Sequence, residues 1–430
     1  VGSNGAWVIG EAILDMPNHP VYNADGNFFT QGGWSNAVAL AKESETATFK
    51  TREMNGNFRL IANIIDGLTL TAQAGVNYKN KNNEDIAKAI PLYTWDNNIT
   101  YYTGAGSPEQ SAVDRTTEET VYQNYTAYLN YDKNFGPDHH LDAMLGMAYE
   151  TEEVRMFMAR RDNFISDELW ELNLGGTGNM KNDAKAEHWA TGSTFARLGY
   201  SFKNKYILET NFRYDGSSRF RRGHRFGFFP SFSAGWRLSE EEFMKDIPWI
   251  YNLKLRASWG QLGNERIDLF RYVDLMNLKV IKNDGSITDY NYPLNGAMQS
   301  GAAITAYNDP NITWETTTMT NVGIDASLLN GNLDFSFEFF DKRTSDILRK
   351  VTLPDQVGGL DGPIRNIGEV SNKGFELNMG YRNNIGNFRY EVNGNMTFIK
   401  NKIVSLKGQT IIDGMFILEE GKPIDSYYML

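Results

Sequence analysis

The chain has 430 residues and carries 42 Lys and Arg against 53 Asp and Glu, a formal net charge of −11. This acidic balance argues against nucleic acid as a partner and against adhesion to an anionic membrane surface. Without cysteine, the chain has no disulfide framework, no thiolate metal site and no cysteine nucleophile. Aromatic residues make up 13% of the chain and there are 40 glycines, a composition that favours β structure.

The hydropathy of the chain leaves a membrane location open. No apolar run reaches the roughly 18–20 residues that a membrane helix requires. A transmembrane strand shows only one face to lipid, so a mean hydropathy of −0.47 is compatible with a membrane barrel. The chain begins at Val1 with no leader-like segment and stops at Leu430 in an apparently structured stretch. We therefore expect it to be a piece of a longer polypeptide.

Strand-like alternation is the dominant pattern after an N-terminal region, up to about Thr51, that indicates loop or irregular strand. Two-faced segments recur in about a dozen places. In one of them, apolar or aromatic positions alternate with polar ones: Tyr206, Leu208, Thr210, Phe212 and Tyr214 against Lys205, Ile207, Glu209, Asn211 and Arg213. In another, Tyr251, Leu253, Leu255, Ala257 and Trp259 alternate against Asn252, Lys254, Arg256 and Ser258.

Aromatic residues stand at both ends of these apolar faces, for example Tyr206 and Tyr214, or Tyr251 and Trp259. Eight to ten residues at ~3.3 Å per residue, tilted by ~40°, span roughly 20–25 Å. That length matches the lipid-facing band between the two aromatic girdles of a membrane barrel. We therefore predict that the apolar face, including Leu208 and Leu253, contacts lipid and that Arg256 faces the lumen.

Short and long connections alternate along the chain, as expected of a barrel with turns at one rim and loops at the other. The short ones are Asp66-Gly67, Lys133–His139, Lys203-Asn204, Asn330-Gly331 and Asn383–Gly386. The long ones are Lys79–Glu118, Glu152–Ala190, Gln261–Glu315 and Leu348–Glu369. In a moderate connection, Ser239 and Glu242 fit a capping box at the start of one helical turn. We find no linker that would divide residues 1–430 into separate domains.

Few residues suggest chemistry. Asp138-His139-His140 is the one local cluster of metal-ligand type, but adjacent strand residues point to opposite faces. The glycine cluster Gly175–Gly178 lacks the strand, helix and lysine of a phosphate loop. We expect no catalytic residues, no metal and no cofactor.

Aromatic side chains in the long connections are the candidate substrate contacts, because such rings stack on sugars and on peptide side chains: Trp95, Tyr101, Tyr102 and Trp170. The alternative is that they pack the loops against one another.

Several long motifs, in order from about Tyr122 onward, resemble the SusC/RagA-type TonB-dependent outer-membrane transporters of Bacteroidetes. They include Arg213–Phe220, Phe228–Arg237, Leu253–Asn264, Asn311–Thr316, Asn366–Leu377 and Gly421–Tyr428. The resemblance implies an all-β, antiparallel transmembrane β-barrel, of which this chain is one part, with about 22 strands in the whole. It also implies an N-terminal plug and final strands outside the chain, a SusD-like surface lipoprotein, coupling to TonB-ExbB-ExbD, and import of glycan or peptide oligomers.

Three rival classes remain open. A passive porin would share the barrel without a plug. A soluble or surface glycan-binding β protein would have water on both faces of its sheet. A surface glycosidase would require two converging carboxylates, which no acidic pair in the sequence suggests. The sequence favours a non-enzymatic transporter in the bilayer of a Gram-negative outer membrane.

Overall fold

The computed structural model shows an all-β protein in which 12 long strands form one hydrogen-bonded sheet. It describes residues 5–14, 16, 18–44, 47–274, 276–277, 279–281, 287–289, 291–294, 296–304, 307–351 and 362–428. By their contacts, these residues form two compact units. The first unit comprises the described parts of 1–57, 75–123 and 151–188, and the second those of 58–74, 124–150 and 189–430. None of the described helices has the length and apolar character needed to cross a bilayer.

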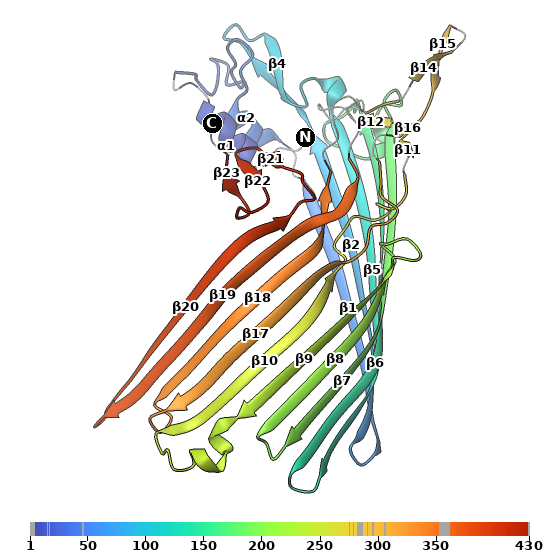
Figure 1. Cartoon of the computed structure of the whole chain (residues 1–430). Helices are drawn as coiled ribbons and strands as arrows, with labels where there is room; N and C mark the ends of the chain where they lie inside the picture. Colours follow the sequence, from blue (N-terminus) through green and yellow to red (C-terminus); the bar gives the residue numbers. More distant parts are fainter. Residues whose placement is uncertain are drawn as a thin grey trace. The chain divides into compact units, whose positions relative to one another are not determined.

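The long strands follow one another in sequence order, with β1 and β20 at the two edges of the sheet. They are β1 (Thr48–Ile65), β2 (Leu68–Ala87), β5 (Ala112–Phe135), β6 (His139–Asp162), β7 (Lys181–Phe202), β8 (Tyr206–Ser217), β9 (Phe226–Arg237), β10 (Ile250–Asn264), β17 (Glu315–Leu328), β18 (Leu333–Lys350), β19 (Ile364–Ile385) and β20 (Phe388–Ser405). This confirms the expected number of strands and the all-β class. Figure 1 shows β8 to β10 and β17 to β20 running side by side.

Shorter elements lie in the connections. The short strands are β3 (Ala89–Tyr93), β4 (Ile99–Gly104), β11 (Met276–Asn277), β12 (Lys279–Ile281), β13 (Ile287–Asp289), β14 (Asn291–Leu294), β15 (Ala297–Ser300), β16 (Ala303–Ile304), β21 (Ile411–Asp413), β22 (Phe416–Leu418) and β23 (Ser426–Tyr427). The helices are α1 (Gly5–Leu14), α2 (Ala37–Glu43), and the 3₁₀ turns η1 (Pro108–Gln110), η2 (Leu172–Leu174), η3 (Leu238–Glu240) and η4 (Glu242–Met244).

The predicted alternation of short and long connections is confirmed. Short turns of two to four residues join β1 to β2, β5 to β6, β7 to β8, β17 to β18 and β19 to β20, whereas the intervening connections are longer. Parts of Gln261–Glu315 and Leu348–Glu369, and the last two residues before the end at Leu430, lie outside the described residues. At the first turn, only glycine fits at Gly67, which has a φ of +80° and whose added Cβ would lie 2.6 Å from the Asp132 carbonyl oxygen.

In the first unit, the N-terminal region forms two helices, so the expectation of loop or irregular strand up to Thr51 was wrong. Asn36 caps α2, and its Oδ1 accepts hydrogen bonds from the backbone N–H groups of Val38 (3.1 Å) and Ala39 (3.0 Å). Leu40 of α2 is buried with Ile90 of β3. The helix has only 7 residues, too few to show a helical period in the sequence.

The strands of the first unit extend farther into the long connections than the sequence predicted. β2 runs to Ala87 and β6 to Asp162, although the apolar alternation ends earlier. Ion pairs stabilise this extension: Lys81 Nζ lies 2.6 Å from Glu118 Oε1, and Arg115 Nε lies 2.5 Å from Glu84 Oε2. Charged partners across neighbouring strands can therefore continue a sheet where apolar ones stop.

In the second unit, cross-strand register gives the sheet two different faces. Leu208 pairs with Ala234, Ala234 with Ala257, and Ala257 with Val322. Directly paired residues share a face, so these side chains belong to one apolar face. Residues one position away, such as Arg256, form the opposite, polar face. The predicted division of these residues between an apolar and a polar face is therefore confirmed.

One detail of the second unit differs from the sequence predictions. Ser239 does not cap a helix, because the two 3₁₀ turns η3 and η4 begin after Arg237 and Glu241 without a side-chain cap. The Ser239 hydroxyl instead donates a hydrogen bond to Asn252 Oδ1 at 3.4 Å. Both turns are 3₁₀ turns of three residues, so no α-helical turn with the geometry of a capping box follows Ser239.

Candidate functional site

The polar face of the second unit carries arginines that are each held by carboxylates. Arg256 of β10 forms ion pairs with Asp325 of β17, at 3.1 Å, and with Glu338 of β18. Arg197 of β7 pairs with Asp142 of β6. At these two arginines, the positive charge is therefore balanced by carboxylates of neighbouring strands.

Further along the same face, β10 and β17 to β20 form a polar hollow of about 450 Å³. The polar-face side chains that line it are amides, carboxylates and hydroxyls: Asn252, Asp325, Ser327, Asp334, Ser336, Asn378, Asn393 and Asn395. Ser336 donates a hydrogen bond to Asp325 Oδ1 at 2.9 Å, and Ser327 donates one to Asp334 Oδ1 at 2.8 Å. Such a surface suits contact with water and with hydroxyl- or amide-bearing molecules.

The hairpin β3–β4 of the first unit carries three of the four predicted aromatic contacts, but on different sides. Tyr101 pairs with Leu92, which is fully buried, whereas Tyr102 pairs with Pro91. Adjacent strand residues point to opposite faces, so Tyr101 and Tyr102 cannot stack on one ligand ring. Trp95, in the hairpin turn, is 58% exposed and makes an edge-to-face contact with Phe29 at a centroid distance of 5.9 Å.

Two aromatic residues beside this hairpin were not singled out from the sequence. Phe29 contacts Trp95, and its backbone bridges Tyr93 of β3. Trp34, which is 47% exposed, follows Gly33, where an added Cβ would lie 3.9 Å from the Tyr101 ring. Neither shows a period or motif in the sequence, because a folded-back segment brings them to the hairpin.

Trp170 lies elsewhere, in the connection between β6 and β7, and is partly buried. Its ring packs on Phe164 at a centroid distance of 5.2 Å, next to the buried Ile86 and Val113. Arg115 fixes this segment, since its Nη1 lies 2.8 Å from Glu171 Oε2 and its Nη2 donates to the Trp170 carbonyl at 3.3 Å. The hydrogen bond from Arg115 holds the pKa of the Glu171 carboxyl below its ordinary value.

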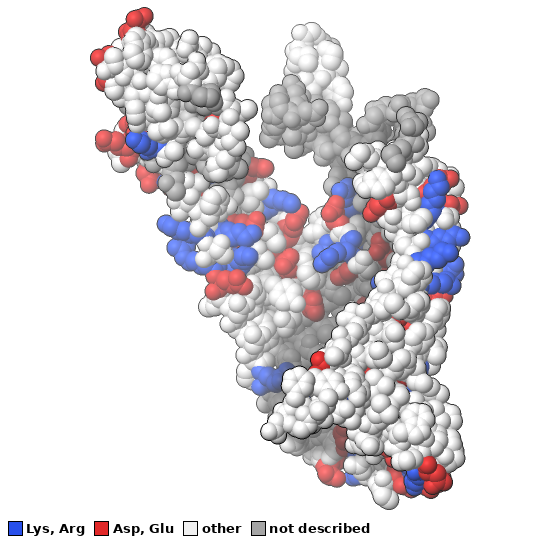
Figure 2. Space-filling view, turned by 90° about the vertical axis from the view of Figure 1, so that its left-hand side faces the viewer, with Lys and Arg blue, Asp and Glu red and all other residues white. Residues whose placement is uncertain are grey.

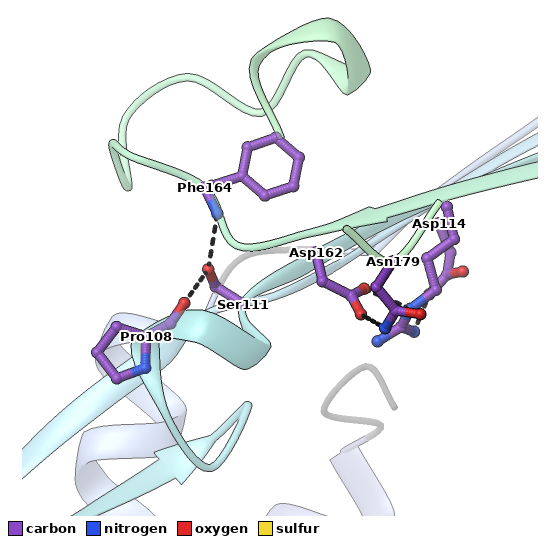
Figure 3. Close-up of polar contacts among 7 residues, drawn as sticks. Pro108, Ser111, Asp114, Asp162, Phe164 and Asn179 are labelled. Carbon is purple, nitrogen blue, oxygen red and sulfur yellow. Dashed lines mark hydrogen bonds and ion pairs between the residues drawn. The ribbon is translucent and has the colours of Figure 1, made fainter. Parts of the chain in front are cut away.

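Polar contacts also fasten the base of that connection, as Figure 3 shows. The Ser111 hydroxyl donates to the Pro108 carbonyl at 2.6 Å and accepts from the Phe164 backbone N–H at 3.4 Å. Asn179 donates to Asp162 Oδ2 at 2.5 Å. The connection between β6 and β7 is therefore tied to the strands at both ends, with Trp170 inside it.

The two adjacent histidines have separate partners in the second unit. His139 Nδ1 lies 2.6 Å from the Tyr200 hydroxyl, and His140 Nε2 lies 3.4 Å from Asp132 Oδ1. Across the described ranges, no three His, Asp or Glu side chains gather in a geometry that would hold a metal ion. Charged side chains instead gather in patches, separated by uncharged surface, on the face seen in Figure 2.

An antiparallel sheet with one exposed apolar face and one face of paired charges defines the wall of a transmembrane β-barrel. Comparison with known proteins gives the family. The chain matches the family described as "TonB dependent receptor-like, beta-barrel" over residues 12–422, and it belongs to that family.

Comparison with individual proteins supports the same family. The chain is 31% identical over 445 residues to the TonB-dependent receptor P3 of Formosa agariphila, covering 99% of this chain and 42% of that protein. It is 28% identical over 450 residues to the TonB-dependent receptor SusC of Bacteroides thetaiotaomicron, covering 97% of this chain and 41% of that protein. The solved RagAB peptide importer in its closed-closed state has the same fold, with a TM-score of 0.80 at 23% identity over 97% of this chain and 45% of that one. The chain thus spans less than half the length of these relatives.

Proposed function

We propose that this chain forms part of the barrel wall of an energised outer-membrane importer of oligomeric nutrients, either glycans or peptides. The observation that supports this most strongly is the two-faced sheet of the second unit. Its apolar face matches lipid, and its polar face of paired charges and amides matches a watery passage. The sheet is open at β1 and β20, and unpaired strand edges are too costly to leave in lipid. Further strands of the whole protein therefore close the barrel.

The proposed importer works with partners that lie outside this chain. Similarity to SusC and to the RagAB peptide importer supports a SusD-like surface lipoprotein and a TonB-ExbB-ExbD system that acts through the N-terminal part of the whole protein. The bilayer surrounds the wall as a multi-pass barrel of a Gram-negative outer membrane. The acidic balance of the chain supports a role without nucleic acid.

The importer needs no catalysis by this chain. A glycosidase needs one carboxylate as an acid and another free to act as base or nucleophile. The inward Asp325 and Glu338 both engage the single guanidinium of Arg256 instead. Ion-paired carboxylates of this kind support a structural role over an enzymatic one.

The aromatic residues of the first unit are the proposed substrate contacts. Trp95 and Tyr101 are 58% and 38% exposed, so their rings are accessible to a sugar or a peptide side chain. Tyr102 would serve a ligand on the other side of the hairpin. A ligand could stack on Trp170 only if the connection between β6 and β7 opened.

Fractionation of the native envelope, with an antibody against this segment, tests the transport proposal on the full-length protein. We expect an outer-membrane band whose mobility changes on heating, because a closed barrel resists unfolding in detergent. A product found in the soluble or secreted fraction would instead favour the soluble or surface glycan-binding protein.

Uptake of labelled oligosaccharides and peptides then tests the substrate contacts. We expect Trp95→Ala to weaken uptake of the cargo without reducing the amount of folded barrel. Phe157→Ala is the matched control, since Phe157 is a similarly exposed aromatic residue (55%) within β6, away from the hairpin turn. Equal losses in both variants would argue against a specific contact by Trp95.

A further inference from the structure

The apolar face of the second unit is hollowed at one place. One row of cross-strand partners, on β8, β9, β10 and β17, consists of Leu208, Ala234, Ala257 and Val322. The two central positions carry only a methyl group, and both are exposed. The row therefore has a low floor of two alanines between two larger aliphatic side chains.

Large side chains border this floor on the neighbouring rows. On one side, Phe232 and Trp259 stack on each other at a centroid distance of 6.0 Å. On the other side, Trp236 pairs with Leu255. Two adjoining hollows, of about 600 and 720 Å³, share all four residues of the alanine row. Together they form one groove, which we call the alanine groove.

The groove ends at a fixed aromatic pair. Tyr206 and Trp236 stack at a centroid distance of 6.3 Å. Glu241 lies in the connection of residues 238–249 between β9 and β10, at the same end of the sheet as the short turns between β7 and β8 and between β17 and β18. Its carboxylate accepts hydrogen bonds from the Tyr206 hydroxyl (2.7 Å) and from Trp236 Nε1 (3.1 Å). Aromatic rings anchored in this way mark the interface of a membrane barrel, and the end of the sheet that carries the short turns lies at its periplasmic rim. The groove therefore lies just inside the periplasmic interface.

We propose that the alanine groove is a binding site for one acyl chain of a phospholipid in the periplasmic leaflet. Side chains of the apolar face supply hydrocarbon to the lining, while the charges of Arg256 and Asp325 lie on the other face. A flexible hydrocarbon chain can fill a narrow depression between rings, and each buried methylene adds to affinity. The proposal depends on the chain lying in the membrane, and it is independent of the cargo.

Native mass spectrometry of the full-length protein, released from its membrane in mild detergent, tests the site through the retained phospholipid. Ala234→Leu and Ala257→Leu fill the floor of the groove. We expect each to lower retained phospholipid about tenfold, as the loss of about two methylene contacts would do. Ala196→Leu is the control, because Ala196 pairs with Phe212 on the same face but outside the groove. Unchanged retention in the groove variants, or an equal loss in the control, would overturn the proposal.

A second readout does not depend on the leucine variants folding. This chain has no cysteine. Once any cysteine outside it is replaced by serine, Ala257→Cys can carry a single photoreactive label in the full-length protein. We expect illumination in native membranes to attach phospholipid to that position, and less of it to the same label at Ala196→Cys. Attachment of a second protein chain instead of lipid would overturn the proposal. Loss of the protein from the membrane fraction would instead contradict the proposed transport function, which separates the two failures.

Discussion

Alternate residues of the same strands, from β7 to β20, form the two faces of the sheet. Different contacts between side chains hold each face together. On the apolar face, rings stack on one another across strands, as Phe375 and Phe398 do at 5.6 Å. On the polar face, charges pair across strands, as Arg256 does with Asp325 and Glu338. Under the proposed function, lipid is the solvent of the apolar face, whereas carboxylates on neighbouring strands balance the charge of Arg256 on the polar face.

Packing against glycine adds to this difference. On the polar face, Phe340 is 7% exposed and its ring covers Gly374 of β19. Nearer the loops, Phe229, Phe220 and Trp314 form a buried cluster. The apolar face has glycines too, but Gly394 has open space around it. Tight packing within the protein is therefore concentrated on the polar side and toward the loops.

The two faces should differ most in how much stability they lose when a charge is introduced. The largest loss is expected for a charge in the middle of the apolar face. Val322 is 55% exposed near the centre of β17. Replacing it with Arg should lower the free energy of unfolding by about 2–4 kcal/mol in lipid vesicles. Ser258→Arg is the control, because Ser258 pairs with Asn321 on the polar face. We expect Ser258→Arg to lower the free energy of unfolding by less than about 1 kcal/mol. Reversible urea unfolding measures both variants.

Leu253, which the sequence predicts to contact lipid, tests how deep each position lies in the membrane. It does face the apolar side, but it lies only three residues after the start of β10. Because the cost of a charge falls to about 0–1 kcal/mol near the interface, Leu253→Arg should be tolerated better than Val322→Arg. The reverse order would show that the membrane boundaries are misplaced along the strands.

A smaller effect should distinguish the glycines. An added Cβ at Gly374 would overlap the Phe398 carbonyl oxygen and lie 2.8 Å from the Phe340 ring. We expect Gly374→Ala to destabilise the barrel by about 1–3 kcal/mol through overpacking. Gly394→Ala should stay within about 0.5 kcal/mol, as for other open positions. The same urea measurement tests both, and equal effects would contradict the difference in packing.

Arg256→Ala should have a still smaller effect, of about 1 kcal/mol. The substitution leaves Asp325 and Glu338 near each other without their cation, but both remain partly exposed, and exposed ion pairs contribute little. We expect the loss of stability to shrink as salt is added, because the repulsion between the carboxylates is screened. A loss that salt does not alter would indicate that Arg256 acts through packing.

The features predicted from sequence are those that depend on local periodicity. Alternation over ten or more residues identified the strands and both faces, and turns such as Asn330-Gly331 identified their ends. The alanine groove could not be predicted, because Ala234 and Ala257 become neighbours only through the register of β9 and β10. Helix α2 was missed because a capping asparagine and three buried side chains stabilise it without a visible period.

For the same reason, the sequence could not show which of the candidate aromatic residues share a face or are buried. In the sequence, Trp95, Tyr101 and Tyr102 are equivalent aromatic residues of one long connection. Only the pairing of β3 with β4 shows that Tyr101 and Tyr102 lie on opposite faces of the hairpin. Trp170 resembles a free loop residue until Phe164 and Arg115 are brought to it from other segments. Which aromatic residue is free to meet a ligand therefore depends on contacts between distant segments.

The smallest predicted effect concerns the edge of the apolar face, where Glu241 holds Tyr206 and Trp236. The hydrogen bond from Tyr206, followed by that from Trp236, lowers the pKa of the Glu241 carboxyl below its ordinary 4.5. The hydrogen bonds to the ionised Glu241 carboxylate therefore stabilise the folded protein above pH 4.5. This stabilisation is lost as the pH falls through the lowered pKa. Glu241→Gln keeps an acceptor oxygen but cannot titrate, so its unfolding midpoint should fall less between pH 7 and about pH 3 than that of the unaltered protein.

Glu242→Gln is the matched control for this pH dependence. Glu242 is the next residue, its side chain is 82% exposed, and its carboxylate pairs with Lys245 at 2.7 Å without touching the aromatic pair. Urea midpoints measured in vesicles across the same pH range should therefore follow the unaltered protein more closely in Glu242→Gln than in Glu241→Gln. If the two glutamine variants behave alike, general charge at the rim, and not the anchoring of Tyr206 and Trp236, sets the acid sensitivity of this edge.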